Sequence, residues 1–444
     1  MTRRSSSRAS LACLFLVLAG ALVLVNCGGG SSSSSSTTTT TTPSTNNSVA
    51  LTVGFGPNGQ AGGYYDGLFT TVTVCQHGST TNCQQVQDVL VDTGSVGLRI
   101  LNSAFTTIQP SSLGVVQDST DDQLQECIQY GDTSFSWGPV WTADVQIAGE
   151  TAASMPIQVI GGNASNPTFA NVPSQCLATP VNPNIPNGGN EDTVATFGAN
   201  GILGVGPYPY DCGSFCTSTA DLSQTGYPYY VCPTGGTCQA TTTTVQVGNP
   251  VAFFSSSDNN GVMITLGSVP AQGAASASGM MYFGIGTQTN NALSSSATLY
   301  ALNTNEGIPT VTYNGIAYTS MNVVDTGSNS LAVADSSTLG IPDCTDNEFY
   351  CPTSTATLSG IQLAGNGGVG SGTVSLSIAN ADQLFAANPT FAAYSNLGSD
   401  GGTSPSTDLW DFGLPFFLGK TVYVGIAGQT VPNGAVAPNG FYAF

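Results

Sequence analysis

A seven-residue motif that occurs twice constrains this chain more than any other feature. Residues 89–95 read Val-Leu-Val-Asp-Thr-Gly-Ser, and residues 322–328 read Asn-Val-Val-Asp-Thr-Gly-Ser. In each copy an apolar stretch typical of a β-strand leads to an Asp on a tight turn, Asp92 and Asp325. A single Asp-Thr-Gly turn is weak evidence, because Asp accepts local backbone hydrogen bonds in many β-proteins. Two copies, one in each half, predict two related lobes that each contribute one Asp loop.

The chain from residue 49 onward is predicted to be β-rich. The Asn314-Gly315 pair predicts a two-residue hairpin, because both residues tolerate the positive φ of such a turn. A body this long exceeds one sheet sandwich, so we expect an N-terminal β-lobe at 49–275 and a C-terminal β-lobe at 276–444. Alternating apolar and polar residues predict strands at 141–147, 262–266, 311–318 and 374–378, and short helices are expected at 336–339 and 380–387.

The body of the chain is nearly without positive charge. The sequence has 5 Lys and Arg against 25 Asp and Glu, and three of the five are Arg3, Arg4 and Arg8. Only Arg99 and Lys420 remain after them. Nucleic-acid binding needs clustered Lys and Arg, so we expect no nucleic-acid partner. Phosphate sites for nucleotides also use basic residues, and we expect no cofactor.

The sequence contains one histidine, His77, between Cys75 and Cys83. A Ser-His-Asp triad or a multi-His zinc site would have to be built on it alone. We therefore expect no metal and infer that any chemistry is carboxylate chemistry.

The N-terminus has the pattern of an export signal. Residues 1–26 combine a basic start with an apolar run at 11–25, which is too short for a comfortable transmembrane helix. Leu24 and Cys27 resemble the bacterial lipoprotein processing box, which implies a lipid-modified Cys27, and the absence of Asp after it favours the outer membrane. Asn26 stands where that box has a smaller residue, so plain secretion is the alternative. Residues 27–48 are rich in Gly, Ser and Thr and predict a flexible tether.

Ten further cysteines predict disulfides, because an even number in an exported chain favours pairing. Close spacing favours Cys75–Cys83 and Cys344–Cys351, and the run from Cys212 to Cys238 has room for two bridges whose pairing stays open. A zinc ribbon is the competing interpretation, and the spacings here are poor for it. The candidates are Cys75, Cys83, Cys127, Cys176, Cys212, Cys216, Cys232, Cys238, Cys344 and Cys351.

Three more segments extend the pattern set by the two Asp loops. Tyr130-Gly131 opens a hairpin-like stretch, residues 201–206 read Gly-Ile-Leu-Gly-Val-Gly, and residues 410–413 read Trp-Asp-Phe-Gly. With the two Asp-Thr-Gly-Ser loops, these segments resemble the pepsin-like aspartic peptidases over residues 49–444. The resemblance implies an all-β, two-lobed fold with a central cleft, and a monomer that acts on or binds polypeptides. It also makes Tyr130 and Gly131 the start of a substrate-covering flap.

The resemblance assigns roles within the loops. Asp92 and Asp325 would be catalytic, and the supporting residues would be Thr93, Gly94, Ser95, Thr326, Gly327 and Ser328. Two carboxylates about 3 Å apart repel by roughly 5 kcal/mol at an effective dielectric constant near 20, so they share one proton. One carboxylate then activates a water and the other protonates the amide carbonyl oxygen. Such a reaction needs neither a metal nor a basic side chain.

Arg99 departs from the pepsin-like pattern, which has a Trp at this place. It either pairs with Asp92 and holds it ionised or faces away and pairs with another acid. The chain also resembles a family of bacterial lipoproteins of unknown function in residues 92–99, 136–140 and 412–417. Three hypotheses follow: an exported aspartic endopeptidase, an inactive surface lipoprotein that binds peptides or a partner protein, and a structural or adhesive β-protein whose two Asp carboxylates lie far apart.

Overall fold

A computed structural model describes residues 47–444 except 58, 60–63, 132–133, 162–171, 177–188, 225, 234–235, 305–306, 321, 346–347, 403–409 and 432–436. The predicted signal at 1–26, Cys27 and nearly all of the tether at 27–48 lie outside the described residues. In the part that the structure describes, no helix has the length and apolarity needed to cross a membrane. Asn47 is buried and its side-chain amide donates to the Phe283 carbonyl at 3.0 Å, so the folded body includes it.

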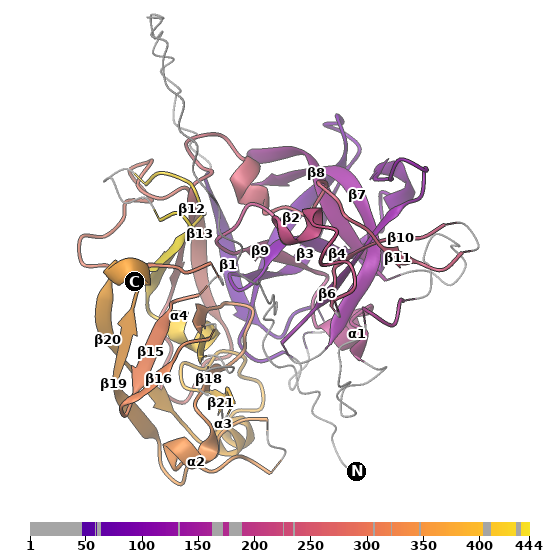
Figure 1. Ribbon diagram of the computed structural model, residues 1–444. Coiled ribbons are helices and arrows are strands. Elements are labelled where there is room, and N and C mark those ends of the chain that lie inside the picture. Colours follow the sequence, from indigo (N-terminus) through magenta and orange to yellow (C-terminus); the bar gives the residue numbers. More distant parts are fainter. Residues whose placement is uncertain are drawn as a thin grey trace, which may run out of the picture.

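The molecule has two β-lobes joined by one long sheet (Figure 1). This sheet has 16 strands in the order β11-β10-β6-β7-β8-β4-β9-β3-β2-β1-β13-β12-β23-β24-β14, with β5 paired to β7 and a further pairing of β7 with β2. Its strands are β1 Ser48–Gly54, β2 Gly67–Gln76, β3 Cys83–Asp92, β4 Val96–Leu101, β5 Gly114–Val115, β6 Leu124–Gln129, β7 Phe135–Ile147, β8 Glu150–Ile160, β9 Gly201–Val205, β10 Tyr229–Val231, β11 Gln239–Ala240, β12 Gly261–Leu266, β13 Ala277–Phe283, β14 Leu299–Ala301, β23 Thr421–Gly425 and β24 Phe441–Ala443.

Two four-stranded sheets complete the second lobe. Their orders are β16-β15-β19-β20 and β17-β22-β18-β21. The first consists of β15 Thr310–Tyr313, β16 Ile316–Tyr318, β19 Ala356–Ala364 and β20 Ser371–Ile378. The second, which carries the second Asp loop, consists of β17 Asn322–Val324, β18 Leu331–Val333, β21 Gly398–Asp400 and β22 Trp410–Phe412.

The helices are short and follow ordinary capping rules. Asp335 accepts from the backbone N–H groups of Ser337 and Thr338, and Asn380 accepts from that of Gln383 at 2.9 Å. The helices predicted at 336–339 and 380–387 are thus α2 and α3. The α-helices are α1 Val194–Phe197, α2 Ser336–Leu339, α3 Ala381–Ala387 and α4 Leu414–Phe417, and 3-10 turns lie at Asn102–Ala104, Pro110–Ser112, Phe215–Thr217, Pro250–Phe253 and Asn366–Gly368.

Local sequence explains where strands turn and which faces they bury. Asn314 and Gly315 have φ of 50° and 80°, and Tyr313 pairs with Ile316, which is the predicted two-residue hairpin. β20 alternates exposed and less exposed residues over its first half, as expected for a strand with one wet face. The last four residues of β3 are all buried, because neighbours cover both of its faces.

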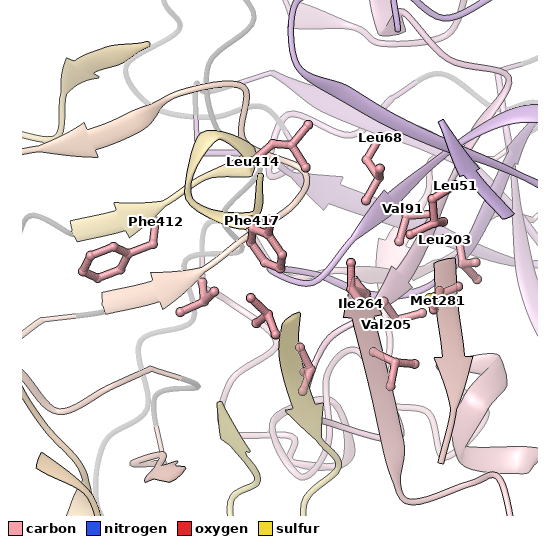
Figure 2. Packing of buried hydrophobic residues seen from close by; sticks show 14 of the residues in the cluster. Leu51, Leu68, Val91, Leu203, Val205, Ile264, Met281, Phe412, Leu414 and Phe417 are labelled. Carbon is pink, nitrogen blue, oxygen red and sulfur yellow. The ribbon is translucent and has the colours of Figure 1, made fainter. Parts of the chain in front are cut away.

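One hydrophobic core runs through both lobes (Figure 2). Leu51, Val91 and Leu203 enter it from the first lobe, Ile264 and Met281 from the joining strands. Phe412, Leu414 and Phe417 enter from the second lobe. The predicted lobe boundary at 275/276 falls between β12 and β13, which pair with each other over five residue pairs. The two lobes therefore share packing and backbone hydrogen bonds.

All ten cysteines considered above are joined in disulfides. Cys75 pairs with Cys83 across the β2–β3 hairpin, where the two residues face each other in register. The pairing that the sequence left open is Cys212–Cys216 and Cys232–Cys238, and the remaining bridges are Cys127–Cys176 and Cys344–Cys351. The fold is all-β, two-lobed and disulfide-containing, as expected from the sequence.

Candidate functional site

The two Asp loops are built by the same three-strand arrangement. In the first lobe β9 lies between β3 and β4, parallel to β3 and antiparallel to β4. In the second lobe β22 lies between β17 and β18 with the same directions. Asp92 is the last residue of β3 and Asp325 comes directly after β17, and each is backed by a segment from more than 80 residues later in the chain. The segments at 201–206 and 410–413 are these backing strands.

Four hydrogen bonds brace one loop against the other. Thr93 Oγ1 donates to the Val324 carbonyl and Thr326 Oγ1 donates to the Val91 carbonyl, both at 2.7 Å. Each hydroxyl also accepts from the partner's backbone N–H, at 3.0 Å for Thr326 N and 3.2 Å for Thr93 N. The brace is symmetric and fully buried, so it fixes the position of the two Asp residues relative to each other.

The carboxyl groups of Asp92 and Asp325 meet at the centre of this brace, and both residues are fully buried. The N–H of Gly94 donates to Asp92 Oδ1 at 2.7 Å and to Asp325 Oδ1 at 3.0 Å, so one donor serves both. A Cβ on Gly327 would lie 2.8 Å from Asp92 Oδ1 and 3.1 Å from Asp325 Oδ1. Both positions need glycine because any side chain there would occupy the space of the carboxyls.

The pKa of Asp325 is raised well above its usual value. Burial is the largest cause, followed by the negative charges of Asp92 and Asp411, and a hydrogen bond from Ser328 opposes the rise. The side chains of Asp92 and Asp325 are also within hydrogen-bond reach of each other. A proton is therefore held in this group of carboxyls at a pH where an exposed Asp would be ionised.

The two serines that follow the glycines behave differently. Ser328 Oγ donates to Asp325 Oδ2 at 2.7 Å and also contacts Asp411 Oδ2. Ser95 instead uses its backbone N–H, which donates to Asp92 Oδ1 at 3.1 Å. Among the described residues neither Ser95 Oγ nor Asp92 Oδ2 has a hydrogen-bond partner, although both are buried. The two halves of the site are therefore chemically unequal.

Tyr130 packs into the first lobe. It is 5% exposed, stacks on Phe197 with ring centroids 6.1 Å apart, and its hydroxyl lies 2.6 Å from Ser136 Oγ. Gly131 follows it on an exposed turn, and residues 132–133 lie outside the described part. A different tyrosine contacts the Asp loops, since the Tyr64 hydroxyl donates to the Gly327 carbonyl at 2.6 Å.

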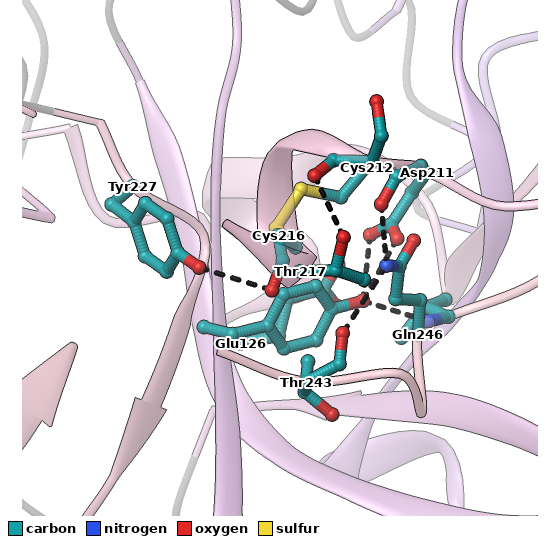
Figure 3. Close-up of a disulfide and its surroundings, with 12 residues drawn as sticks. Glu126, Asp211, Cys212, Cys216, Thr217, Tyr227, Thr243 and Gln246 are labelled. Atoms are coloured by element: carbon teal, nitrogen blue, oxygen red, sulfur yellow. Dashed lines mark hydrogen bonds between the residues drawn. A yellow bond between two sulfur atoms is a disulfide. The ribbon is translucent and has the colours of Figure 1, made fainter. Parts of the chain in front are cut away.

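Arg99 faces away from Asp92 and pairs with two other acids. Its Nη2 lies 2.6 Å from Glu126 Oε1 and 2.9 Å from Asp211 Oδ2, and its Nη1 donates to the Val96 carbonyl at 2.7 Å. The Tyr229 hydroxyl also donates to Asp211, at 2.8 Å from Oδ1. Figure 3 shows Glu126 and Asp211 beside the Cys212–Cys216 disulfide. The interpretation in which Arg99 pairs with Asp92 is therefore wrong.

The structure also places the single histidine and the cysteines that the sequence offered as possible metal ligands. His77, the only histidine of the sequence, is on the β2–β3 turn, and its Nδ1 lies 3.0 Å from Asp144 Oδ1. In the described part of the chain, one group of potential metal ligands gathers, Cys344, Cys351 and Asp382. Its two cysteines are joined in a disulfide and offer no thiolate.

Sequence reasoning missed Asp411, which stands beside Asp325 through Ser328. The signal was present, because Asp411 lies between Trp410 and Phe412 in a segment otherwise expected to be a buried strand. An acid flanked by large apolar residues in such a strand indicates a buried carboxyl. Glu126 and Asp211 carried no comparable signal, since their partner Arg99 is remote from both in the sequence.

Comparisons with known proteins find similar solved structures and a protein family. The chain is similar to the crystal structure of an aspartic proteinase from Irpex lacteus, with 16% identity, a TM-score of 0.46, and coverage of 89% of this chain and 96% of that one. No curated protein matches the chain. A family model matches residues 43–444, a range that includes every residue that the structure describes. The chain therefore belongs to the family described as "Protein of unknown function (DUF3443)".

Proposed function

We propose that this protein is an exported aspartic endopeptidase, secreted or anchored to the outer membrane through Cys27. The observation that carries the proposal is the pairing of Asp92 and Asp325, which share the Gly94 N–H and are fully buried. A raised pKa at Asp325 supports it, because the pair then supplies one acid and one base. Asp92 and Asp325 are the proposed catalytic residues.

The proposed reaction needs only water and the two carboxyls. The water oxygen bonds to the carbonyl carbon of the scissile amide while one carboxylate takes a proton from that water. The other carboxyl gives its proton to the carbonyl oxygen, which forms a neutral tetrahedral diol. The carboxyl that took the water proton then gives it to the amide nitrogen, the C–N bond breaks, and one hydroxyl of the diol returns a proton to the other carboxylate. This releases an amine and a carboxylic acid and restores the dyad. The substrate would lie between the lobes with the Tyr130 hairpin over it.

The environment of Arg99 favours an enzyme over a binding protein. An Arg paired with Asp92 would hold that carboxyl ionised and oppose the sharing of a proton. Arg99 is instead engaged with Glu126 and Asp211. This removes one ground for the alternative, an inactive lipoprotein that binds peptides or a partner protein, and that alternative is kept as an outcome of the test.

The test compares the purified protein with its Asp325→Asn variant. Both are incubated with a diverse peptide mixture from about pH 2.5 to 7, and the products are identified by mass spectrometry. We expect cleavage by the parent and a loss of about 10²–10⁴-fold in the variant, the range for removing a general acid or base. Asp258→Asn is the matched control, because Asp258 is also buried and bonded to serine hydroxyls but lies outside the dyad. Peptides that bind and remain intact would support the binding protein instead.

A further inference from the structure

Asp411 breaks the symmetry between the two lobes. In register, Val91 pairs with Leu203 and Val324 pairs with Phe412, so β22 corresponds to β9 one residue at a time. Ile202 in the first lobe then corresponds to Asp411 in the second. The outgoing strands agree, since Arg99 pairs with Ile202 and Ala332 pairs with Asp411. A carboxyl therefore stands where the other lobe has an apolar side chain, and it is fully buried.

The Ser328 hydroxyl links Asp411 to the dyad. Its Oγ is within hydrogen-bond distance of both Asp325 Oδ2 and Asp411 Oδ2. A hydroxyl has a single hydrogen and can donate to only one of the two oxygens. The other contact joins two acceptors unless one carboxyl also carries a proton. The arrangement therefore requires a proton on Asp325 or on Asp411.

The described residues supply no cation to this group of three carboxyls. Arg99 is held by Glu126 and Asp211, the Lys420 Nζ donates to the Phe416 carbonyl at 2.6 Å, and His77 is beside Asp144. From the first lobe the Tyr64 hydroxyl, a titratable but uncharged group, also faces the second loop and donates to the Gly327 carbonyl. Three negative charges buried next to one another are too costly to coexist, and no described cation is in contact with Asp92 or Asp325, so the group holds at least one proton.

Asp325 is the position where that proton removes the most repulsion. It lies between the other two, within hydrogen-bond reach of Asp92 on one side and joined through Ser328 to Asp411 on the other. A proton on Asp92 leaves Asp325 and Asp411 repelling each other, and a proton on Asp411 leaves Asp92 and Asp325 repelling. A proton on Asp325 relieves both pairs at once.

We propose that Asp411 is a positioning residue whose carboxylate, acting through the Ser328 hydroxyl, keeps the proton of the dyad on Asp325 and leaves Asp92 as the ionised partner. This assignment rests on the proposed peptidase function, in which Asp325 is then the general acid and Asp92 the general base. In this arrangement the protonated Asp325 donates to Ser328 Oγ, the reverse of the direction that holds when Asp325 is ionised, and Ser328 donates to Asp411. The upward shift in the pKa of Asp325, to which the charge of Asp411 contributes, agrees with this direction.

The assignment fixes the path of each proton in the proposed reaction. Asp92 Oδ2 is buried and accepts no hydrogen bond from the described residues, so no donor among them competes for its lone pairs when a water enters the site. As the water oxygen bonds to the carbonyl carbon, one water proton goes to Asp92 and the Asp325 proton goes to the carbonyl oxygen. Asp411 neither gains nor loses a proton in the step, and the Ser328 hydroxyl can turn to donate to the ionised Asp325 Oδ2 once the Asp325 proton has left.

The test is the pH dependence of kcat/KM for the parent and for Asp411→Asn. The basic limb of such a profile reports loss of the proton from the essential acid, here Asp325. Removing the charge of Asp411 lowers the pKa of Asp325, so we expect the basic limb to move about one pH unit toward acid. Above the parent's basic midpoint, kcat/KM relative to the optimum would then fall about tenfold. Asp258→Asn is the control and should leave the profile in place.

A second variant and a second readout keep the proposal testable. Asp411→Ile carries the residue that the first lobe has at this place, so it serves if Asp411→Asn does not fold, and we expect the same acidic shift. Infrared spectra read the protonated carboxyl directly, without any activity. The band lost in Asp325→Asn isolates Asp325, and its midpoint should lie at lower pH when Asp411 is also Asn.

The outcomes separate this proposal from the peptidase function. An equal loss of kcat/KM at every pH, with an unmoved basic limb and infrared midpoint, would assign Asp411 a structural role only and overturn the proposal. A shift toward alkaline pH would place the proton on Asp411 and also overturn it. If the parent cleaves no peptide but the infrared midpoint moves to acid, the proton assignment stands and the peptidase function fails.

Discussion

The two Asp loops have the same strand arrangement and unequal chemistry. Both consist of an incoming strand, an Asp-Thr-Gly-Ser turn, an outgoing strand and a backing strand between them. The threonines exchange the same four hydrogen bonds across the interface. The backing strands differ, however, because the first lobe has Ile202 where the second has Asp411. A shared frame can therefore hold two carboxyls with different tasks.

The outgoing strands also differ, but here the charged residue is in the first lobe. Arg99 is in the first lobe, and the register places Ala332 at the corresponding position of the second. Arg99 lies in a fully buried network with Glu126, Asp211 and Tyr229 and does not neutralise the dyad. In this comparison the first lobe's extra charge stabilises the lobe, whereas the second lobe's extra charge acts on the site.

The largest expected effect on stability comes from breaking that network in the first lobe. Arg99→Met leaves Glu126 and Asp211 buried without a cation, and we expect a loss of about 3–5 kcal/mol in the free energy of unfolding. Urea unfolding at neutral pH measures it. Lys420→Met is the control, since Lys420 Nζ bonds to a carbonyl and pairs with no carboxylate among the described residues, and it should change stability by less than about 1 kcal/mol. A similar small loss for Arg99→Met would mean that the network is solvated.

The next effect tests the symmetry of the brace. Thr93→Val and Thr326→Val each leave one buried carbonyl without its donor and one buried N–H without its acceptor. We expect losses of about 2–4 kcal/mol that agree within about 1 kcal/mol between the two variants. Unfolding measurements should show that the exposed control Thr120→Val stays within about 0.5 kcal/mol of the parent. A large loss from one threonine alone would contradict a symmetric frame.

The smallest effect sharpens the difference between the two serines. Ser328→Ala removes a hydrogen bond of 2.7 Å to Asp325 and the contact with Asp411, so we expect a loss of about 1–2 kcal/mol. Ser95→Ala removes a hydroxyl that has no partner among the described residues and should stay within about 0.5 kcal/mol of the parent. The two variants are compared by urea unfolding, and equal losses would show that the two sides of the dyad are equivalent.

The Asp loops, a hairpin and a disulfide were predictable because each is set by residues that are close together in the sequence. The repeated apolar strand and Asp-Thr-Gly-Ser turn predicted two related loops, Asn314-Gly315 predicted a hairpin, and short spacing favoured Cys75–Cys83. Each of these depends on residues that are close in the chain, where backbone preferences and turn chemistry act. The alternation of apolar residues predicted strands within β7, β12 and β20 for the same reason.

What only the tertiary structure decided depends on residues far apart in the chain. Arg99 meets Glu126 and Asp211, and Ser328 meets Asp411, because strand register and the crossing of β22 place them together. No local sequence pattern predicts which of several acids a buried guanidinium or hydroxyl group contacts. The sequence by itself determined that two Asp loops exist, and the fold decided that Arg99 stays apart from them and that a third carboxyl joins them.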